Sequence, residues 1–151
     1  MTTLAAPSSV QTFEFVREHL IEATPDIVFG AILDEIGPES IKLDGSPMPL
    51  KLEPFVGGRW YRDTGNNTGH LWGHVQVIKP PTIIELRGPL MMSYAATNHV
   101  QYQLVAEGKS TRLKFKHSAI GLFTPEHCAG MEKGWTFKLA RVRELAMKKT
   151  K

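Results

Sequence analysis

Hydrophobic and polar residues alternate along most of the chain, as they do in strands that bury one face. The first such stretch is 13–22, and the others follow from residue 58 onward, separated by short runs rich in Gly, Asn and Pro. The later stretches predict strands at 58–63, 70–79, 82–87, 97–106 and 111–119. Because short turn sequences join neighbouring stretches, we expect a single antiparallel meander.

Two other stretches carry helical signals. Thr24-Pro25-Asp26 offers an N-cap, a proline at the first helical position and an acid in the first turn, which predicts a short helix over 25–34. A second short helical turn is expected at 39–43. After Thr124-Pro125-Glu126, apolar residues recur at helical spacing: Met131, Trp135, Leu139, Val142, Leu145 and Ala146. The chain therefore closes with one long helix that has a single face to bury.

One amphipathic helix and one antiparallel sheet must cover each other, so the sequence predicts an α+β fold in which a curved sheet wraps around the C-terminal helix. A twisted sheet that curls around a helix leaves space that side chains do not fill completely. Gly130 and Gly134 lie about one turn apart on the predicted helix. They would either widen this space or allow close backbone packing.

The length of 151 residues, of which 42% are hydrophobic, suits one domain. We expect this domain at 13–151, after a flexible N-terminal tail at 1–12. No run approaches the roughly 20 apolar residues that span a bilayer, and the first residues do not form a signal peptide. Together with the single Cys128, these features predict a cytoplasmic protein without a membrane anchor.

The formal net charge of +3 does not predict nucleic-acid binding. Four basic residues, Arg143, Lys148, Lys149 and Lys151, lie at the C-terminal end of the predicted helix, where they complement the helix dipole. The other basic residues are scattered among 15 acidic ones, and aromatic and basic residues do not interleave as in a base-stacking strand. We expect no nucleic acid as a partner.

Polar side chains that share a strand face with large hydrophobic residues are predicted to point inward: Arg17, His19, Tyr102 and His117. His117, for example, alternates in phase with Leu113 and Phe115. Buried polar groups need hydrogen-bond partners. These four either satisfy one another or lie at the rim, or they bind the polar end of a ligand.

His70, Trp72, His74 and Gln76 alternate out of phase with Val75 and Val77, and are predicted to face outward. An exposed Trp72 would indicate a partner surface, for which a homodimer is the simplest explanation. Residues four apart on a strand are separated by about 13 Å, which is too far for two histidines to share one ion. We expect neither a metal nor a cofactor.

No sequence motif specifies a reaction: a nucleophile elbow, a phosphate loop, a paired-cysteine zinc pattern and a dinucleotide fingerprint are all missing. Cys128 follows His127 near the start of the last helix, but neighbours on a helix point in different directions, so we expect an unreactive thiol. If the protein is an enzyme, the hypothesis is acid/base chemistry. His117 or His19 would carry the proton, and Tyr102 or Arg17 would polarise an oxygen.

The order of strand, helix pair, meander and long C-terminal helix resembles the helix-grip superfamily, also named START-like, Bet v 1-like or SRPBCC. Short motifs resemble its branch related to the C-terminal domain of the activator of Hsp90 ATPase: 21–29, 57–60, 73–75 with 79–81, 111–117, and Gly134-Trp135 followed by Leu139. The resemblance covers 13–147. In eukaryotic members a separate N-terminal domain takes part in Hsp90 binding; that domain is missing here, so we do not expect an Hsp90-type chaperone as a partner.

The resemblance implies a pocket between sheet and helix that holds a small apolar or amphipathic molecule. The residues expected to bind it are Arg17, His19, Trp60, Tyr102, Phe115, His117, Met131 and Trp135. Three functions remain open: a small-molecule binding protein, an enzyme of polyketide cyclase or dehydratase type that uses the same pocket, and a stress- or chaperone-associated interaction module. A binding protein releases its ligand unchanged, an enzyme alters it, and an interaction module exposes a large apolar patch.

Overall fold

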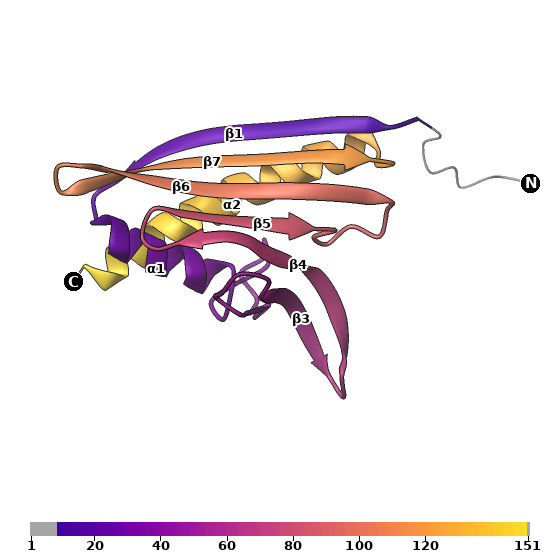
Figure 1. Cartoon of the computed structure of the whole chain (residues 1–151), viewed down its shortest axis with the longest axis horizontal. Coiled ribbons are helices and arrows are strands. Elements are labelled where there is room, and N and C mark those ends of the chain that lie inside the picture. Colours follow the sequence, from indigo (N-terminus) through magenta and orange to yellow (C-terminus); the bar gives the residue numbers. More distant parts are fainter. Residues whose placement is uncertain (1–8, 151) are drawn as a thin grey trace, which may run out of the picture.

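The computed structural model describes residues 9–150, so the first eight residues of the expected N-terminal tail lie outside the described part. The described part consists of a seven-stranded sheet and two helices (Figure 1). In chain order they are β1 (Gln11–Ile21), α1 (Pro25–Glu35), β2 (Lys51–Leu52), β3 (Arg59–Gly65), β4 (Thr68–Lys79), β5 (Ile83–Gly88), β6 (Ala96–Glu107), β7 (Ser110–Gly121) and α2 (Pro125–Lys149).

The sheet is an antiparallel meander whose first strand returns to its last. The strand order is β1-β7-β6-β5-β4-β3-β2, and β1 pairs with β7 along its whole length. A two-residue turn, Asn66-Asn67 with φ of +53° and +60°, joins β3 to β4, and asparagine tolerates this left-handed backbone. The β3–β4 hairpin bends away from the other strands in Figure 1. The predicted curved antiparallel sheet is confirmed.

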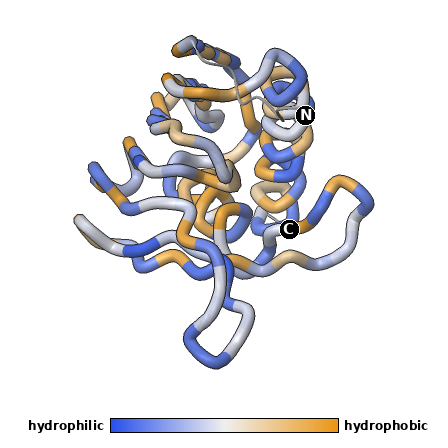
Figure 2. The backbone as a smooth tube through the Cα atoms, turned by 90° about the vertical axis from the view of Figure 1, so that its right-hand side faces the viewer, coloured by the Kyte–Doolittle hydropathy of each residue, from blue (hydrophilic) through white to orange (hydrophobic). Residues whose placement is uncertain are grey.

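Helix α2 lies along one face of this sheet (Figure 1). The Thr124 side chain caps it by accepting a hydrogen bond from the backbone N–H of His127, and Pro125 occupies the first turn. Its buried stripe contains Trp135, Lys138, Leu139, Val142, Leu145 and Ala146. Figure 2 shows hydrophobic positions recurring along this helix between hydrophilic ones. No helix within residues 9–150 is long and apolar enough to cross a membrane.

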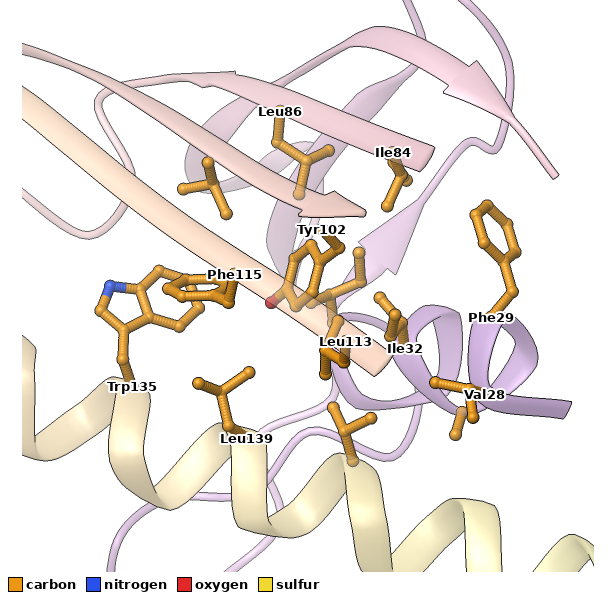
Figure 3. Packing of buried hydrophobic residues seen from close by; sticks show 14 of the residues in the cluster. Val28, Phe29, Ile32, Ile84, Leu86, Tyr102, Leu113, Phe115, Trp135 and Leu139 are labelled. Atoms are coloured by element: carbon orange, nitrogen blue, oxygen red, sulfur yellow. The ribbon is translucent and has the colours of Figure 1, made fainter. Parts of the chain in front are cut away.

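Helix α1 covers one end of the same core. Phe29 and Ile32 of α1 point toward side chains of the sheet, and Leu139 approaches from α2 (Figure 3). Lys149 near the end of α2 forms an ion pair with Asp34 of α1, with 2.9 Å between the charged atoms. The C-terminal half of α2 is therefore fixed against both the sheet and α1.

The second helical turn expected at 39–43 is not present. Residues 36–39 form hydrogen-bonded turns, and Ile41 forms a β-bridge with Pro47. The backbone N–H of Met48 donates to the Ser40 carbonyl, so the loop folds back on itself. Gly45, with φ of +87°, permits the reversal. Hydrogen bonds across the loop replace the bonds that a helix would make along it.

Trp72 is buried rather than outward-facing, because β4 contains a β-bulge. Trp60 of β3 pairs with Gly73, and the next residue, Tyr61, pairs with Leu71, so Trp72 is an extra residue that reverses the alternation. Trp72 is 3% exposed and Leu71 is 42% exposed, which is the opposite of the predicted phase. The partner surface predicted from an exposed Trp72 is therefore wrong, whereas His74 is exposed as predicted.

Candidate functional site

A cavity of about 820 Å³ lies beside the first half of α2. Its walls come from α2, from the β3–β4 hairpin, and from the loops around residues 41–48 and 90–92. Apolar side chains form most of its surface: Ile41, Leu43, Met48, Trp60, Trp72, Leu90, Met91, Met92, Met131, Trp135 and Phe137. The predicted space between sheet and helix is therefore located where α2 begins.

Gly130 and Gly134 both line this cavity. A Cβ atom added at either position would meet no atom within 4 Å, so neither glycine is needed for close backbone packing. Of the two interpretations of these glycines, the one in which they widen the space holds. Alanine at both positions would narrow the cavity without a steric clash.

His117 lies at the cavity wall, and it belongs to a series of hydrogen bonds that runs from Trp135 to the Gly88 carbonyl. The indole Nε1–H of Trp135 donates to His117 Nδ1 over 2.8 Å, and His117 Nε2 lies 2.7 Å from Asn98 Oδ1. Because an indole N–H can only donate, Nδ1 is the acceptor and Nε2 carries the proton. Asn98 Nδ2 donates in turn to the Gly88 carbonyl. The polar partners of His117 are therefore Trp135 and Asn98, and none of the other three polar residues expected to point inward bonds to it.

This environment also keeps the imidazole neutral. Burial, followed by the charges of His127 and His99, lowers the pKa of His117 to about 4. Both ring nitrogens already have partners, so His117 is poorly placed to exchange a proton with a bound molecule near neutral pH. Its geometry is that of a residue that orients Trp135.

Four of the eight residues expected to bind a ligand line the cavity: Trp60, His117, Met131 and Trp135. Trp60 is oriented by its indole N–H, which donates to the Ile36 carbonyl over 2.7 Å. All three tryptophans of the chain, including Trp72, contribute to the walls. Any molecule that enters the cavity therefore changes the surroundings of these three fluorophores.

Arg17 and His19 do not line the cavity, because β1 is an edge strand of the sheet. Arg17 is exposed, and its guanidinium lies 4.1 Å from the centre of the Phe15 ring. His19 is half-buried, and burial, together with Arg143 and Arg17, lowers its pKa. Arg143 of α2 approaches His19 and donates to the neighbouring Leu20 carbonyl, whereas Arg17 stays exposed.

Tyr102 and Phe115 also lie outside the cavity, in the packed core under α2 (Figure 3). The Phe115 ring is centred 4.5 Å from Trp135 and 5.0 Å from Tyr102. The Tyr102 hydroxyl has no hydrogen-bond partner among the described residues. Burial, followed by the charge of Glu35, raises the pKa of Tyr102.

The sequence analysis missed a buried ion pair, Glu35 of α1 with Lys138 of α2. Lys138 Nζ lies 3.1 Å from Glu35 Oε2, and the two residues are 8% and 0% exposed. Lys138 lines the cavity, whereas Glu35 lies behind it. Burial raises the pKa of Glu35 to about 7, although Lys138 and then Arg141 act in the opposite direction. The sequence did contain a signal for this pair, because Glu35 and Lys138 each lie among the apolar residues on the buried face of a helix.

Cys128 does not line the cavity. Burial, followed by the charge of Glu132, raises the pKa of its thiol, which agrees with the expected unreactive cysteine. Within residues 9–150, the His, Cys, Asp and Glu side chains do not form a group of three that could hold a metal ion.

No protein-family model matches this sequence, and no curated protein matches it either. Solved structures do match. A protein of Rhizobium leguminosarum superposes with a TM-score of 0.70 at 15% identity, over 93% of this chain and 97% of that one. The Mll3558 protein of Rhizobium loti gives 0.69 at 22% identity, over 91% and 99%. A norcoclaurine synthase from Thalictrum gives 0.60 at 13% identity, over 95% and 99%.

The chain has the helix-grip fold, also called START-like or Bet v 1-like. The predicted fold is thereby confirmed. At these identities the likeness establishes the fold, and the branch related to the activator of Hsp90 ATPase stays a prediction. In this helix-grip protein the cavity occupies the space between the sheet and the first half of α2.

Proposed function

We propose that this protein binds a small hydrophobic or amphipathic molecule in the cavity beside the first half of α2. The observation that carries the proposal is an apolar cavity of about 820 Å³, held open by two glycines of one helix. Ligand pockets typically measure about 300–1,000 Å³ and have mostly apolar walls. The volume and lining support a binding site of this kind.

The two glycines support the proposal because each of them lowers the stability of the helix. A glycine in a helix interior destabilises the fold by about 1 kcal/mol relative to alanine. Close packing does not require Gly130 or Gly134, because a Cβ atom there would meet nothing within 4 Å. Room for a ligand is a benefit that would offset this cost.

A cavity-filling variant tests the proposal. Gly134→Leu places a branched side chain in the cavity, and Gly134→Ala is the matched control that removes the same glycine while leaving most of the space. Native mass spectrometry of the purified proteins, followed by extraction of small molecules, detects and identifies a bound compound. We expect a ligand with the wild type and with Gly134→Ala, and none with Gly134→Leu. Equal occupancy in all three would contradict the proposal.

A second candidate function is acid/base catalysis on the bound molecule, as in a polyketide cyclase or dehydratase. Two observations favour it: an ionisable pair, Glu35 and Lys138, adjoins the cavity, and the solved norcoclaurine synthase holds a transition-state analogue. Catalysis would appear in the extraction experiment as an altered mass of the recovered compound. In this second candidate function, neither His117 nor His19 carries the proton.

The exposed Trp72 that would have indicated a partner surface is not found, because Trp72 is buried. The interaction-module hypothesis stays a prediction. A homodimer and a cytoplasmic location stay predictions. The native mass spectrum that detects a ligand also measures the number of chains in the particle.

A further inference from the structure

Lys138 is a buried cation at the wall of an otherwise apolar cavity. Its ammonium group donates one hydrogen bond, to Glu35 Oε2, and its nitrogen lies 6.0 Å from the centre of the Trp72 ring. An ammonium has three N–H donors. The other two have no acceptor among residues 9–150, although the side chain is only 10% exposed. A buried charge with unused donors beside a cavity is the feature of a polar anchor.

We propose that the Lys138 ammonium group binds the carboxylate of an amphipathic ligand whose apolar body fills the rest of the cavity. This inference rests on the proposed function and specifies the chemical class of its ligand. The apolar walls formed by Trp60, Leu90, Met92 and Met131 accommodate the body. Charge-assisted hydrogen bonds to an ammonium are among the stronger ones in a buried site.

The groups around the pair determine how binding depends on pH. Glu35 is faced by Lys138 and Arg141 from α2 and by the Tyr102 hydroxyl from β6. Arg141 is already engaged by Glu39 and Glu144. An incoming carboxylate would therefore share the Lys138 charge with Glu35.

Protonation of Glu35 relieves this competition. Because burial raises the pKa of Glu35 to about 7, the group can take up a proton near neutral pH when an anion arrives. The affinity for a carboxylate should then fall as the pH rises from 6 to 8, when Glu35 becomes an anion beside the ligand. His70 and His127 also line the cavity, and Glu35→Gln isolates the part of the pH dependence that Glu35 causes.

The experiment compares decanoic acid with 1-decanol, two probes with the same apolar chain. Binding is followed by the fluorescence of Trp60, Trp72 and Trp135 at pH 6 and pH 8. The variants are Glu35→Gln, Lys138→Met and the double variant E35Q/K138M. The double variant replaces the pair by neutral groups of similar shape, so it tests the anchor even if Lys138→Met alone does not fold.

In the wild type at pH 6 we expect the acid to bind about tenfold more tightly than the alcohol, since one buried charge-assisted hydrogen bond contributes on that order. This preference should shrink at pH 8. In E35Q/K138M it should disappear while the alcohol binds as before, and in Glu35→Gln it should persist at pH 8.

The outcomes separate the two proposals. If the alcohol binds and the acid binds no better, or if E35Q/K138M keeps the preference for the acid, the carboxylate anchor is refuted and the apolar binding site stands. If neither probe binds the wild type, both proposals fail for ligands of this class.

Discussion

Replacing Glu35 with glutamine tests whether burial holds this carboxyl group partly protonated. Burial raises its pKa from 4.5 to about 7 in the folded protein. In the unfolded chain the group titrates near its ordinary value of about 4.3–4.5. Between these two values the folded state binds a proton that the unfolded state has lost. The free energy of unfolding therefore falls as the pH rises through this window.

The size of the Glu35 pKa shift determines how much the free energy of unfolding changes with pH. Moving a carboxyl pKa from 4.5 to about 7 changes the free energy of unfolding by about 3 kcal/mol across the whole window. Most of this, roughly 2.5 kcal/mol, falls between pH 5 and pH 8. Glutamine keeps the shape and does not titrate, so the stability of Glu35→Gln relative to the wild type should rise by this amount from pH 5 to pH 8.

Glu35→Gln must be compared with the wild type at each pH, because His117 changes the free energy of unfolding with pH in the opposite direction to Glu35. Its pKa is lowered to about 4, so its contribution is present above pH 6.5 and is lost as the pH falls toward 4. In the wild type the slopes from Glu35 and His117 partly cancel. The difference between two variants that share His117 removes its contribution.

The assay is urea unfolding at pH 5, 6, 7 and 8, followed by tryptophan fluorescence, for the wild type, Glu35→Gln and the control Glu22→Gln. Glu22 is an exposed glutamate just before α1. Its replacement should leave the difference from the wild type nearly constant across the pH range. A difference for Glu35→Gln that is as flat as that of the control would refute the reasoning.

Other substitutions probe the same structure. Lys138→Met removes the counter-charge of Glu35 and should destabilise the protein by about 3–5 kcal/mol at pH 8 and by clearly less at pH 5, as measured by urea unfolding. In an NMR titration the His117 imidazole should show a midpoint near 4, and a midpoint near 6.5 would contradict its neutral, doubly bonded state. Gly134→Ala should raise the free energy of unfolding by about 0.5–1 kcal/mol. Gly73→Ala should lower it by about 1–3 kcal/mol, because the added Cβ would lie 2.5 Å from a main-chain oxygen of β5.

Strand alternation predicted the layers of the fold because each strand has one face in the core. In β7 the buried residues Leu113, Phe115 and His117 alternate without interruption. In β4 the same reasoning failed at Trp72, because a bulge changes the phase. The bulge lies where Gly73 approaches the backbone of β5 too closely for any side chain. That contact lies between two strands, so the alternation within β4 alone cannot reveal it.

Alternation also predicts the face on which a residue lies but not its position across the sheet. Arg17 and Phe115 share a face and are opposite each other in the β1–β7 pairing. Phe115 packs under Trp135, whereas Arg17 is exposed on the edge strand. The extent of α2 over the sheet decides which of these residues is covered. Position along α2 was the better guide, because Met131 and Trp135 were expected at the site and line it.

Trp135 divides α2 into two halves with different neighbours. Before it, Gly130 and Gly134 leave space beside the helix; after it, Leu139 and Val142 fill the space against the sheet. Lys138 lies at this boundary, where the packed core meets the cavity. Replacing a buried ion pair by apolar residues is often neutral or stabilising, so stability alone is a weak reason to retain the pair with Glu35. The proposed carboxylate ligand gives a reason for a buried charge at the wall of an apolar cavity that stability does not give.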